Sequence, residues 1–256
     1  MKLGVCRGYK EAEVIAAAGY DYIELYFADL ARMDEAEFCE AKKKLAENGL
    51  QAETFNGFFP GDMVLLGPNA DHEKIKAHAE CGMRRAAELG GKVAVLGSGT
   101  ARRVPEGMTS EEGWEEFKKI AALCGDIALQ YGMVIAIEPL NAGETNQVIT
   151  VADGLRLCRE LNHPGVRVLA DYFHVYKSGE TLDAVREAGD FLVHTHLARA
   201  ADDRGCPSWA DKEACARFFT ALKESGYEGR MSLECIYEDF ETQIKDVLPM
   251  LRELAE

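Results

Sequence analysis

Four acidic or imidazole side chains stand at the ends of four consecutive strand-like runs in the second half of the sequence. Glu138, Asp171, His196 and Glu234 each occupy the last position of an apolar, β-branched run or the position just beyond it. Three carboxylates within a few ångströms of one another would raise one another's pKa values unless a cation lay among them. An oxygen-rich set with one imidazole predicts one divalent ion, Mn²⁺ before Mg²⁺ or Co²⁺. Zinc fits less well because it favours nitrogen and sulfur ligands.

Each of these residues alone has a simpler explanation. A single carboxylate at a strand end more often pairs with an arginine or caps a helix than binds a metal. A single histidine more often serves as a hydrogen-bonded wall residue. Because four such residues recur at the corresponding point of four consecutive strands, we favour the metal.

Two further histidines lie beside this set. His194 is two residues before His196 and faces the same side of a strand, one layer deeper, so we expect it to support the site. His174 follows Asp171 by three residues and can reach a substrate oxygen. His163 precedes a strand at the opposite end, where a turn-stabilising role is expected.

Several charged residues have two interpretations. Glu24 ends the second strand-like run and is expected to line the interior or support the site. The Arg102-Arg103 pair is compatible with a phosphosugar contact or with an exposed, charge-balancing loop. The aromatic run around Phe58 and Phe59 could stack on a sugar or pack onto the protein.

The elements that must position these residues alternate along the whole chain. Strands are expected at 3–6, 22–26, 51–55, 92–96, 133–137, 166–170, 192–196 and 230–234. Helices are expected at 11–18, 34–48, 72–89, 110–131, 149–161, 182–188, 212–225 and 239–254, several of them followed by glycine. Eight such units predict an α/β fold, a (β/α)₈ TIM barrel, as one domain over residues 1–256. A doubly wound sheet is disfavoured because Cys6-Arg7-Gly8-Tyr9 is no Gly-rich fingerprint.

In such a barrel the active site lies at the carboxyl ends of the strands. The long connections 56–71 and 97–105 leave those ends, so we expect them to form substrate walls or lids.

The composition narrows the classes of partner. The chain has 256 residues, 47% of them hydrophobic, and a formal net charge of −15. That charge disfavours a nucleic-acid partner, which requires a basic face. Neither a signal peptide nor a membrane-length apolar run is present, and the eight scattered cysteines are expected to be reduced thiols. We therefore expect a cytoplasmic protein with no membrane partner.

Taken together, the motifs resemble those of the sugar-phosphate isomerase/epimerase superfamily, whose members have a xylose-isomerase-like barrel. The resemblance rests on Glu-Pro-Leu-Asn at 138–141 with Glu144, Asp-x-x-His at 171–174, His-x-His at 194–196 and Glu234. It covers essentially the whole chain and is strongest to the ketose 3-epimerases of the tagatose and psicose group.

The resemblance implies a role for each matching residue. The Mn²⁺-type ion would be held by Glu138, Asp171, His196 and Glu234. Glu144 and His174 would contact the sugar substrate. The family arginine normally follows the strand-seven histidine by six residues, where this chain has Asp202. Of its neighbours Arg199 and Arg204, we choose Arg204 as the substrate contact. Relatives are commonly dimers or tetramers, so the resemblance also implies a homo-oligomer.

Such a site is expected to invert a hydroxyl-bearing carbon next to the carbonyl of a ketose through an enediolate. Glu138 and Glu234 would act as base and acid on the two faces of that carbon. Elimination by a hydro-lyase or lyase acting on a sugar or inosose stays open, as does hydroxypyruvate-type isomerisation.

Two other classes are disfavoured. An abasic-site endonuclease needs three metals and additional histidines where this chain has Phe55-Asn56 and Gly97-Ser98. A non-catalytic sugar-binding protein would not need the complete ligand set.

Overall fold

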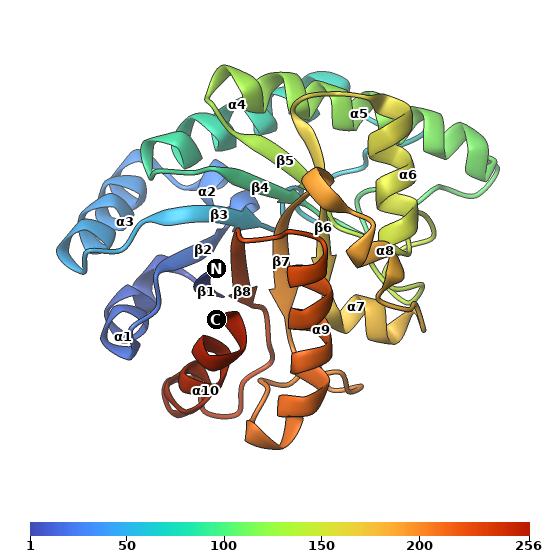
Figure 1. Ribbon diagram of the computed structural model, residues 1–256. Coiled ribbons are helices and arrows are strands. Elements are labelled where there is room, and N and C mark those ends of the chain that lie inside the picture. The colour runs from blue at the N-terminus through green and yellow to red at the C-terminus, as the bar shows by residue number, and fades with distance from the viewer.

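Eight parallel strands form a closed barrel in which each strand pairs with the next along the chain and β8 pairs with β1. The computed structural model describes residues 1–256. The strands are β1 Lys2–Cys6, β2 Tyr22–Tyr26, β3 Ala52–Asn56, β4 Val93–Leu96, β5 Val134–Ile137, β6 Val166–Asp171, β7 Leu192–Leu197 and β8 Arg230–Leu233 (Figure 1). The expected TIM barrel is therefore confirmed.

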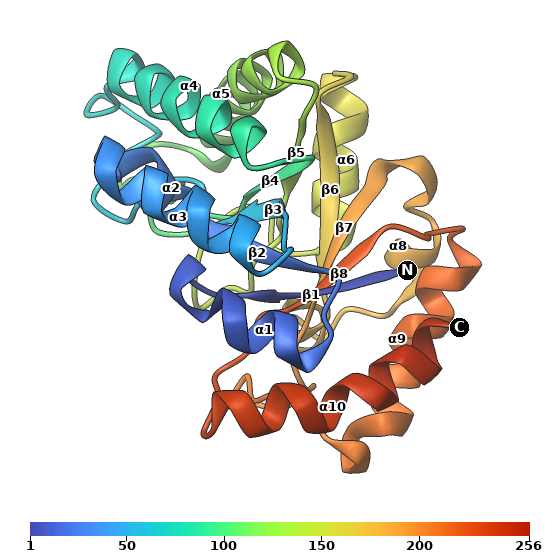
Figure 2. The same ribbon diagram turned by 90° about the vertical axis from the view of Figure 1, so that its left-hand side faces the viewer.

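The helices form a layer outside the strands (Figure 1). They are α1 Ala12–Ala18, α2 Phe27–Arg32, α3 Glu35–Glu47, α4 His72–Glu88, α5 Ser110–Gln130, α6 Val151–Leu161, α7 Tyr172–Lys177, α8 Asp183–Arg186, α9 Lys212–Glu224 and α10 Phe240–Ala255. Short 3₁₀ turns lie at η1 Tyr9–Glu11, η2 Gly189–Phe191 and η3 Trp209–Asp211. Helices α1 and α10 pack side by side, which brings the two termini near each other (Figure 2).

The long helices begin where side chains satisfy their free amide groups. Thr109 accepts a hydrogen bond from the Glu112 amide, and the Glu112 carboxylate accepts one from the Thr109 amide at 2.8 Å. Thr150 and Asp153 make the same reciprocal pair at the start of α6. Such a capping box satisfies two free donors at once, so it fixes the first residue of each helix.

Two helices were not expected from the sequence. Helices α2 and α7 have six residues each and follow β2 and β6 directly. Helices this short have little stability of their own, and their apolar pattern is too brief to distinguish from a loop. The expected helix at 182–188 is also shorter than predicted, because regular α-helix covers only Asp183–Arg186.

The barrel interior is divided into an apolar and a polar part. Val93, Val95, Ala136 and Leu169 form an apolar cluster separate from the main core. On the other side Tyr22 fills the space above Gly4, where any side chain would overlap its ring, and its hydroxyl lies 2.7 Å from Ser232 Oγ. The polar part lies beneath the ends of β7 and β8, which carry two of the candidate metal ligands.

The loop after β3 packs onto the protein with its aromatic side chains. The rings of Phe27 and Phe58 stack with centroids 4.0 Å apart, and Phe59 and Met63 are buried beside them. Of the two interpretations of this aromatic run, packing is therefore the one that the structure shows.

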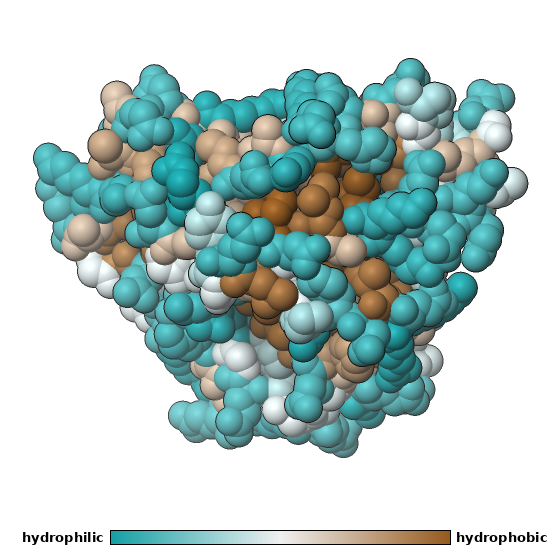
Figure 3. All heavy atoms as spheres, turned by 90° about the horizontal axis from the view of Figure 1, so that it is seen from above, coloured by the Kyte–Doolittle hydropathy of each residue, from teal (hydrophilic) through white to brown (hydrophobic).

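The outer surface over α4 and α5 is mostly hydrophilic, with apolar atoms exposed between the polar side chains (Figure 3). None of the helices combines the length and the apolar character that crossing a bilayer would require.

Candidate metal centre and active site

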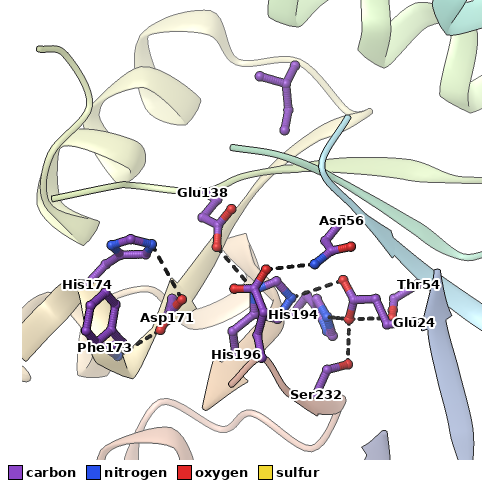
Figure 4. A network of polar contacts seen from close by, with 12 residues as sticks. Glu24, Thr54, Asn56, Glu138, Asp171, Phe173, His174, His194, His196 and Ser232 are labelled. Atoms are coloured by element: carbon purple, nitrogen blue, oxygen red, sulfur yellow. Dashed lines mark hydrogen bonds and ion pairs between the residues drawn. The ribbon is translucent and has the colours of Figure 1, made fainter. Parts of the chain in front are cut away.

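The four predicted ligands converge at the carboxyl ends of neighbouring strands. Figure 4 shows three of them, Glu138, Asp171 and His196. Glu138 directly follows β5, Asp171 ends β6, His196 is the penultimate residue of β7, and Glu234 directly follows β8. One ligand atom from each residue can be chosen so that all four lie within 4.8 Å of one another. The sequence-predicted set is thus brought together at one point of the barrel mouth.

Within this cluster, His196 Nδ1 lies 3.1 Å from Glu138 Oε1 and 3.2 Å from Glu234 Oε2. The other Glu234 oxygen accepts a 2.7 Å hydrogen bond from the Asn56 amide. Any side chain on Gly97 would overlap the Glu138 carboxylate, because Oε2 lies against the position of a Cβ atom there. Glycine at the end of β4 is therefore required for Glu138 to lie against the backbone.

The second nitrogen of His196 is held from below by Glu24. Nε2 lies 3.0 Å from Glu24 Oε1, and the carboxylate can only accept, so Nε2 carries the proton. This leaves the Nδ1 lone pair directed at the carboxylates above, where a cation could bind it. A carboxylate that fixes the tautomer of a ligating histidine is a common feature of metal sites.

Glu24 is the centre of a fully buried polar network. It also contacts His194 Nε2 at 2.7 Å and accepts hydrogen bonds from Thr54 at 2.8 Å and from Ser232 (Figure 4). Burial alone would raise the pKa of Glu24, but His194 and His196 outweigh it and hold this pKa well below its usual value. Glu24 and His194 therefore support the ligand His196.

The electrostatics of the cluster favour the binding of a cation. Burial and the nearby charge of Glu234 raise the pKa of Glu138. Burial would lower the pKa of His196, but Glu24 and Glu234 raise it well above the usual value. A proton on His196 offsets part of the negative charge of the carboxylates. A divalent ion would offset the same charge and could take the place of that proton at Nδ1.

Arg204 lies over the cluster. Its Nη2 is 3.0 Å from Asp171 Oδ2 and also contacts the Glu234 carboxylate, while its guanidinium lies 5.0 Å from the centre of the Phe173 ring. Burial would raise the pKa of Glu234, but Arg204 and His196 outweigh it and lower that pKa strongly. Arg199 instead pairs with Asp203. The geometry is therefore consistent with choosing Arg204 over Arg199.

His174 presents a free donor at the same place. Its Nδ1 accepts a 3.2 Å hydrogen bond from the Asn141 backbone amide, so the proton resides on Nε2. Nε2 is buried, has no hydrogen-bond partner and lies 3.6 Å from Asp171 Oδ2. A buried donor without a partner is unusual, and here it is positioned to donate to an oxygen atom of a ligand above the cluster.

Glu144 lies at the rim of the same space. Its carboxylate accepts a 2.9 Å hydrogen bond from the Asn141 side chain and lies 4.0 Å from both Arg204 Nη1 and His174 Nδ1. The side chain is 42% exposed, so it remains accessible to hydroxyl groups.

Arg102 has a different role from either of its two interpretations. It is fully buried and donates to the backbone carbonyls of Leu96 at 3.3 Å, Glu138 at 2.9 Å and Val148 at 3.3 Å. Burial lowers its pKa to about 10. Arg102 therefore joins the ends of β4 and β5 and fixes the backbone of Glu138, and it is neither a phosphate contact nor an exposed charge.

Cys6 lies beside Glu24 and His196 beneath the cluster. Cys6, Glu24 and His196 are also close enough to hold an ion. Burial and the charge of Glu24 raise the pKa of Cys6 well above its usual value, and Cys6 and His196 lie against the same carboxylate. The two histidines already compensate the charge of Glu24.

Of the residues around the cluster, Asn56 was not assigned a role from sequence, and the role of Arg102 was not among the two interpretations given to it. Asn56 ends β3, just as the predicted metal ligands stand at the ends of their strands. A polar residue at that position could therefore have indicated a contact with the cluster. The sequence around Arg102 gives no sign of its role, because its partners are backbone carbonyls of three separate segments. His163 has the expected role, since its Nδ1 accepts from the Gly165 amide at 3.0 Å and its Nε2 lies 3.1 Å from Asp126.

The set of donors fits a hard divalent cation. It offers three carboxylates and one neutral imidazole nitrogen, with Arg204 and the free His174 donor at the open side. Oxygen-rich sets of this kind suit Mn²⁺ and Mg²⁺.

Relatives of known activity share this architecture. The chain is 28% identical over 236 residues to the L-ribulose 3-epimerase of Methylomonas sp., covering 90% of this chain and 78% of the relative. It is 24% identical to the D-psicose 3-epimerase of Ruminiclostridium cellulolyticum, covering 87% and 76%. The crystal structure of the 3-keto-D-glucoside 4-epimerase YcjR from Escherichia coli superposes with a TM-score of 0.81 at 22% identity, covering 99% of both chains.

These comparisons confirm the family and the class of enzyme, an isomerase or epimerase, that the sequence indicates. The family model of the xylose isomerase-like TIM barrel matches residues 12–254, which is nearly the whole chain. The protein therefore belongs to the xylose isomerase-like TIM barrel family.

Proposed function

We propose that the protein is a metal-dependent sugar epimerase that inverts a hydroxyl-bearing carbon next to the carbonyl of a keto sugar. The observation that supports it most is the convergence of Glu138, Asp171, His196 and Glu234 within 4.8 Å. The relatives named above are sugar epimerases that act beside a carbonyl, which supports the reaction class.

The four residues of the cluster would hold the ion, for which we propose Mn²⁺. When bound, it would supply a Lewis acid that polarises the substrate carbonyl and acidifies the adjacent C–H bond.

The two glutamates would perform the proton transfers. Glu138 would act as the base and remove the proton from one face of the carbon. Glu234 would return a proton to the other face, so that the centre is inverted. Both side chains approach His196 Nδ1, from the ends of β5 and β8.

The remaining groups would bind the sugar. His174 Nε2–H and the Arg204 guanidinium would donate to oxygen atoms that gain negative charge during the reaction. Glu144 would accept hydrogen bonds from hydroxyl groups at the exposed rim.

The test supplies Mn²⁺ and a panel of free and phosphorylated ketoses and of 3-keto glycosides in deuterated water. We expect deuterium at the inverted carbon, together with the epimer as product. Glu138→Gln and Glu234→Gln should each abolish the exchange, whereas Glu228→Gln, a control on an exposed acid at the opposite end of the barrel, should leave it unchanged. Full exchange in either site variant would refute the assigned roles, and a product that has lost water would identify a hydro-lyase instead.

A further inference from the structure

A cavity of about 580 Å³ opens beside the candidate active site without including any of its metal ligands. It lies between the ends of β1 and β2 and the segments that follow them, η1 and α2. Because the carboxyl ends of the strands meet on one face of the barrel, the cavity and the metal cluster open on the same face.

Two side chains of the cavity wall, Arg7 and Tyr26, stand at the carboxyl ends of β1 and β2. Both line the cavity, and the Tyr26 ring lies over Gly57, with Cδ1 3.7 Å from the position of a Cβ atom there. Gly57 directly follows Asn56, whose amide holds Glu234. Burial raises the pKa of Tyr26, and the charge of Glu234 is among the further causes. The cavity is therefore only about one side chain away from the proposed catalytic acid.

Arg7 is held in place without a carboxylate partner. Its guanidinium lies 4.5 Å from the ring centres of both Tyr237 and Phe240. Stacking on aromatic rings orients the guanidinium plane and leaves its N–H groups available at the edges. Arg7 is thus a fixed donor at the inner wall of the cavity.

The remaining lining has both signs of charge. Lys10 forms no ion pair and lies near the Tyr9 ring, and Asp29 and Glu37, both exposed, also form none. Free carboxylates would repel a phosphate, and free cations would repel a cationic ligand. Unpaired donors and acceptors beside the Tyr26 ring, which is 38% exposed, suit instead a neutral ring that carries many hydroxyl groups.

We propose that this cavity is a subsite for a second sugar ring, so that the substrate is a keto glycoside, such as a keto disaccharide, rather than a free ketose. The inference rests on the proposed epimerase function and names its substrate class. The keto ring would lie over the metal cluster, and the second ring would extend past Tyr26 to Arg7 and Asp29. The volume is within the range of about 300–1,000 Å³ typical of pockets for ligands of two-ring size.

The test compares methyl 3-ketoglucoside with 3-ketocellobiose as substrates, in deuterated water with Mn²⁺. We expect kcat/KM to be at least about tenfold higher for the disaccharide, since tenfold corresponds to only about 1.4 kcal/mol of added binding. In Arg7→Met, which keeps an unbranched apolar side chain but removes the hydrogen-bond donors, this preference should fall about tenfold. Asp29→Asn provides a second variant on the opposite wall, and Lys119→Met, an exposed lysine on α5, is the control.

A second measurement separates this inference from the proposed function. Cellobiose, which has no keto group, is titrated calorimetrically into the wild type, Arg7→Met and Asp29→Asn. Binding that both variants weaken supports the subsite even if no keto sugar exchanges, an outcome that would refute only the epimerase function. Equal kcat/KM for the two substrates in the wild type, or an unchanged preference in both variants, overturns the subsite.

Discussion

Replacing Glu24 with glutamine tests whether a carboxylate outside the metal cluster sets the affinity of the cluster for its ion. Glutamine has nearly the same volume, but its amide has one acceptor oxygen where Glu24 has two. Glu24 contacts His194 Nε2 at 2.7 Å and His196 Nε2 at 3.0 Å. If the amide group faces His196, the proton of that ring must move to Nδ1, which then no longer offers a lone pair to a cation.

The size of the effect follows from this network. Loss of a residue that orients a metal ligand typically lowers metal affinity about 10–100-fold. Breaking a buried ion pair costs about 3–5 kcal/mol, and we expect the lower end because Thr54 and Ser232 can still bond the amide. With about 2–4 °C per kcal/mol for a chain of this size, Tm should fall by about 6–12 °C.

The assay titrates Mn²⁺ alone into metal-free protein by calorimetry and measures Tm separately. Glu53→Gln is a matched control, because Glu53 is also buried and ion-paired, with Lys2 and Arg230 at the opposite end of the barrel. It should lose stability but keep its metal affinity. If Glu24→Gln binds Mn²⁺ as tightly as the control, the argument that Glu24 fixes the His196 tautomer is wrong.

Two further predictions concern metal removal and pH. Removal of the metal by a chelator should abolish the exchange. A free metal concentration of 100 times Kd adds about 2.7 kcal/mol to the free energy of unfolding, so Tm should be about 5–11 °C lower after chelation than at that concentration. An unchanged Tm in differential scanning calorimetry would contradict a bound ion. Burial raises the pKa of Asp21, but hydrogen bonds from Arg252, at 2.7 and 2.8 Å, and from the Leu3 amide lower it below its usual value. The stability from this pair is therefore present above about pH 4 and is lost as the pH falls through the folded-state pKa. In urea unfolding, Asp21→Asn should be less stable than wild type at pH 7 by about 1 kcal/mol or less, and the difference should shrink steadily as the pH falls below about 4.

The strands and the convergence of the four candidate ligands could be predicted because their signals are local. A buried parallel strand is a short apolar run, and a ligand such as Asp171 or His196 stands at its end, so one rule locates both. The ends of neighbouring strands then meet by topology alone. The segments that carry the four candidate ligands can therefore be predicted from the sequence alone.

The supporting residues could not be predicted in the same way. Arg102 contacts three carbonyl groups that belong to separate segments, and any buried polar side chain could have taken that role. Helix α7 depends on Asp171, whose side chain accepts the Phe173 amide at 2.7 Å. The same aspartate is a predicted metal ligand, and only the structure shows that it also begins a helix.

The division of the barrel interior explains why the site can hold its geometry. His196 can face the carboxylates at the barrel mouth only if its ring is held in place from below. The buried acid Glu24 holds it, and the negative charge of Glu24 must in turn be compensated. The Glu24 carboxylate is hydrogen-bonded by His194, Thr54 and Ser232 rather than paired with a solvent-exposed lysine. All of these partners are buried. Polar groups arranged in this way are costly if any member is lost, so the network cannot vary freely. Differences in substrate choice between barrels of this design are therefore expected in the loops above β1 and β2, where Arg7 and Tyr26 lie, rather than in the ligands.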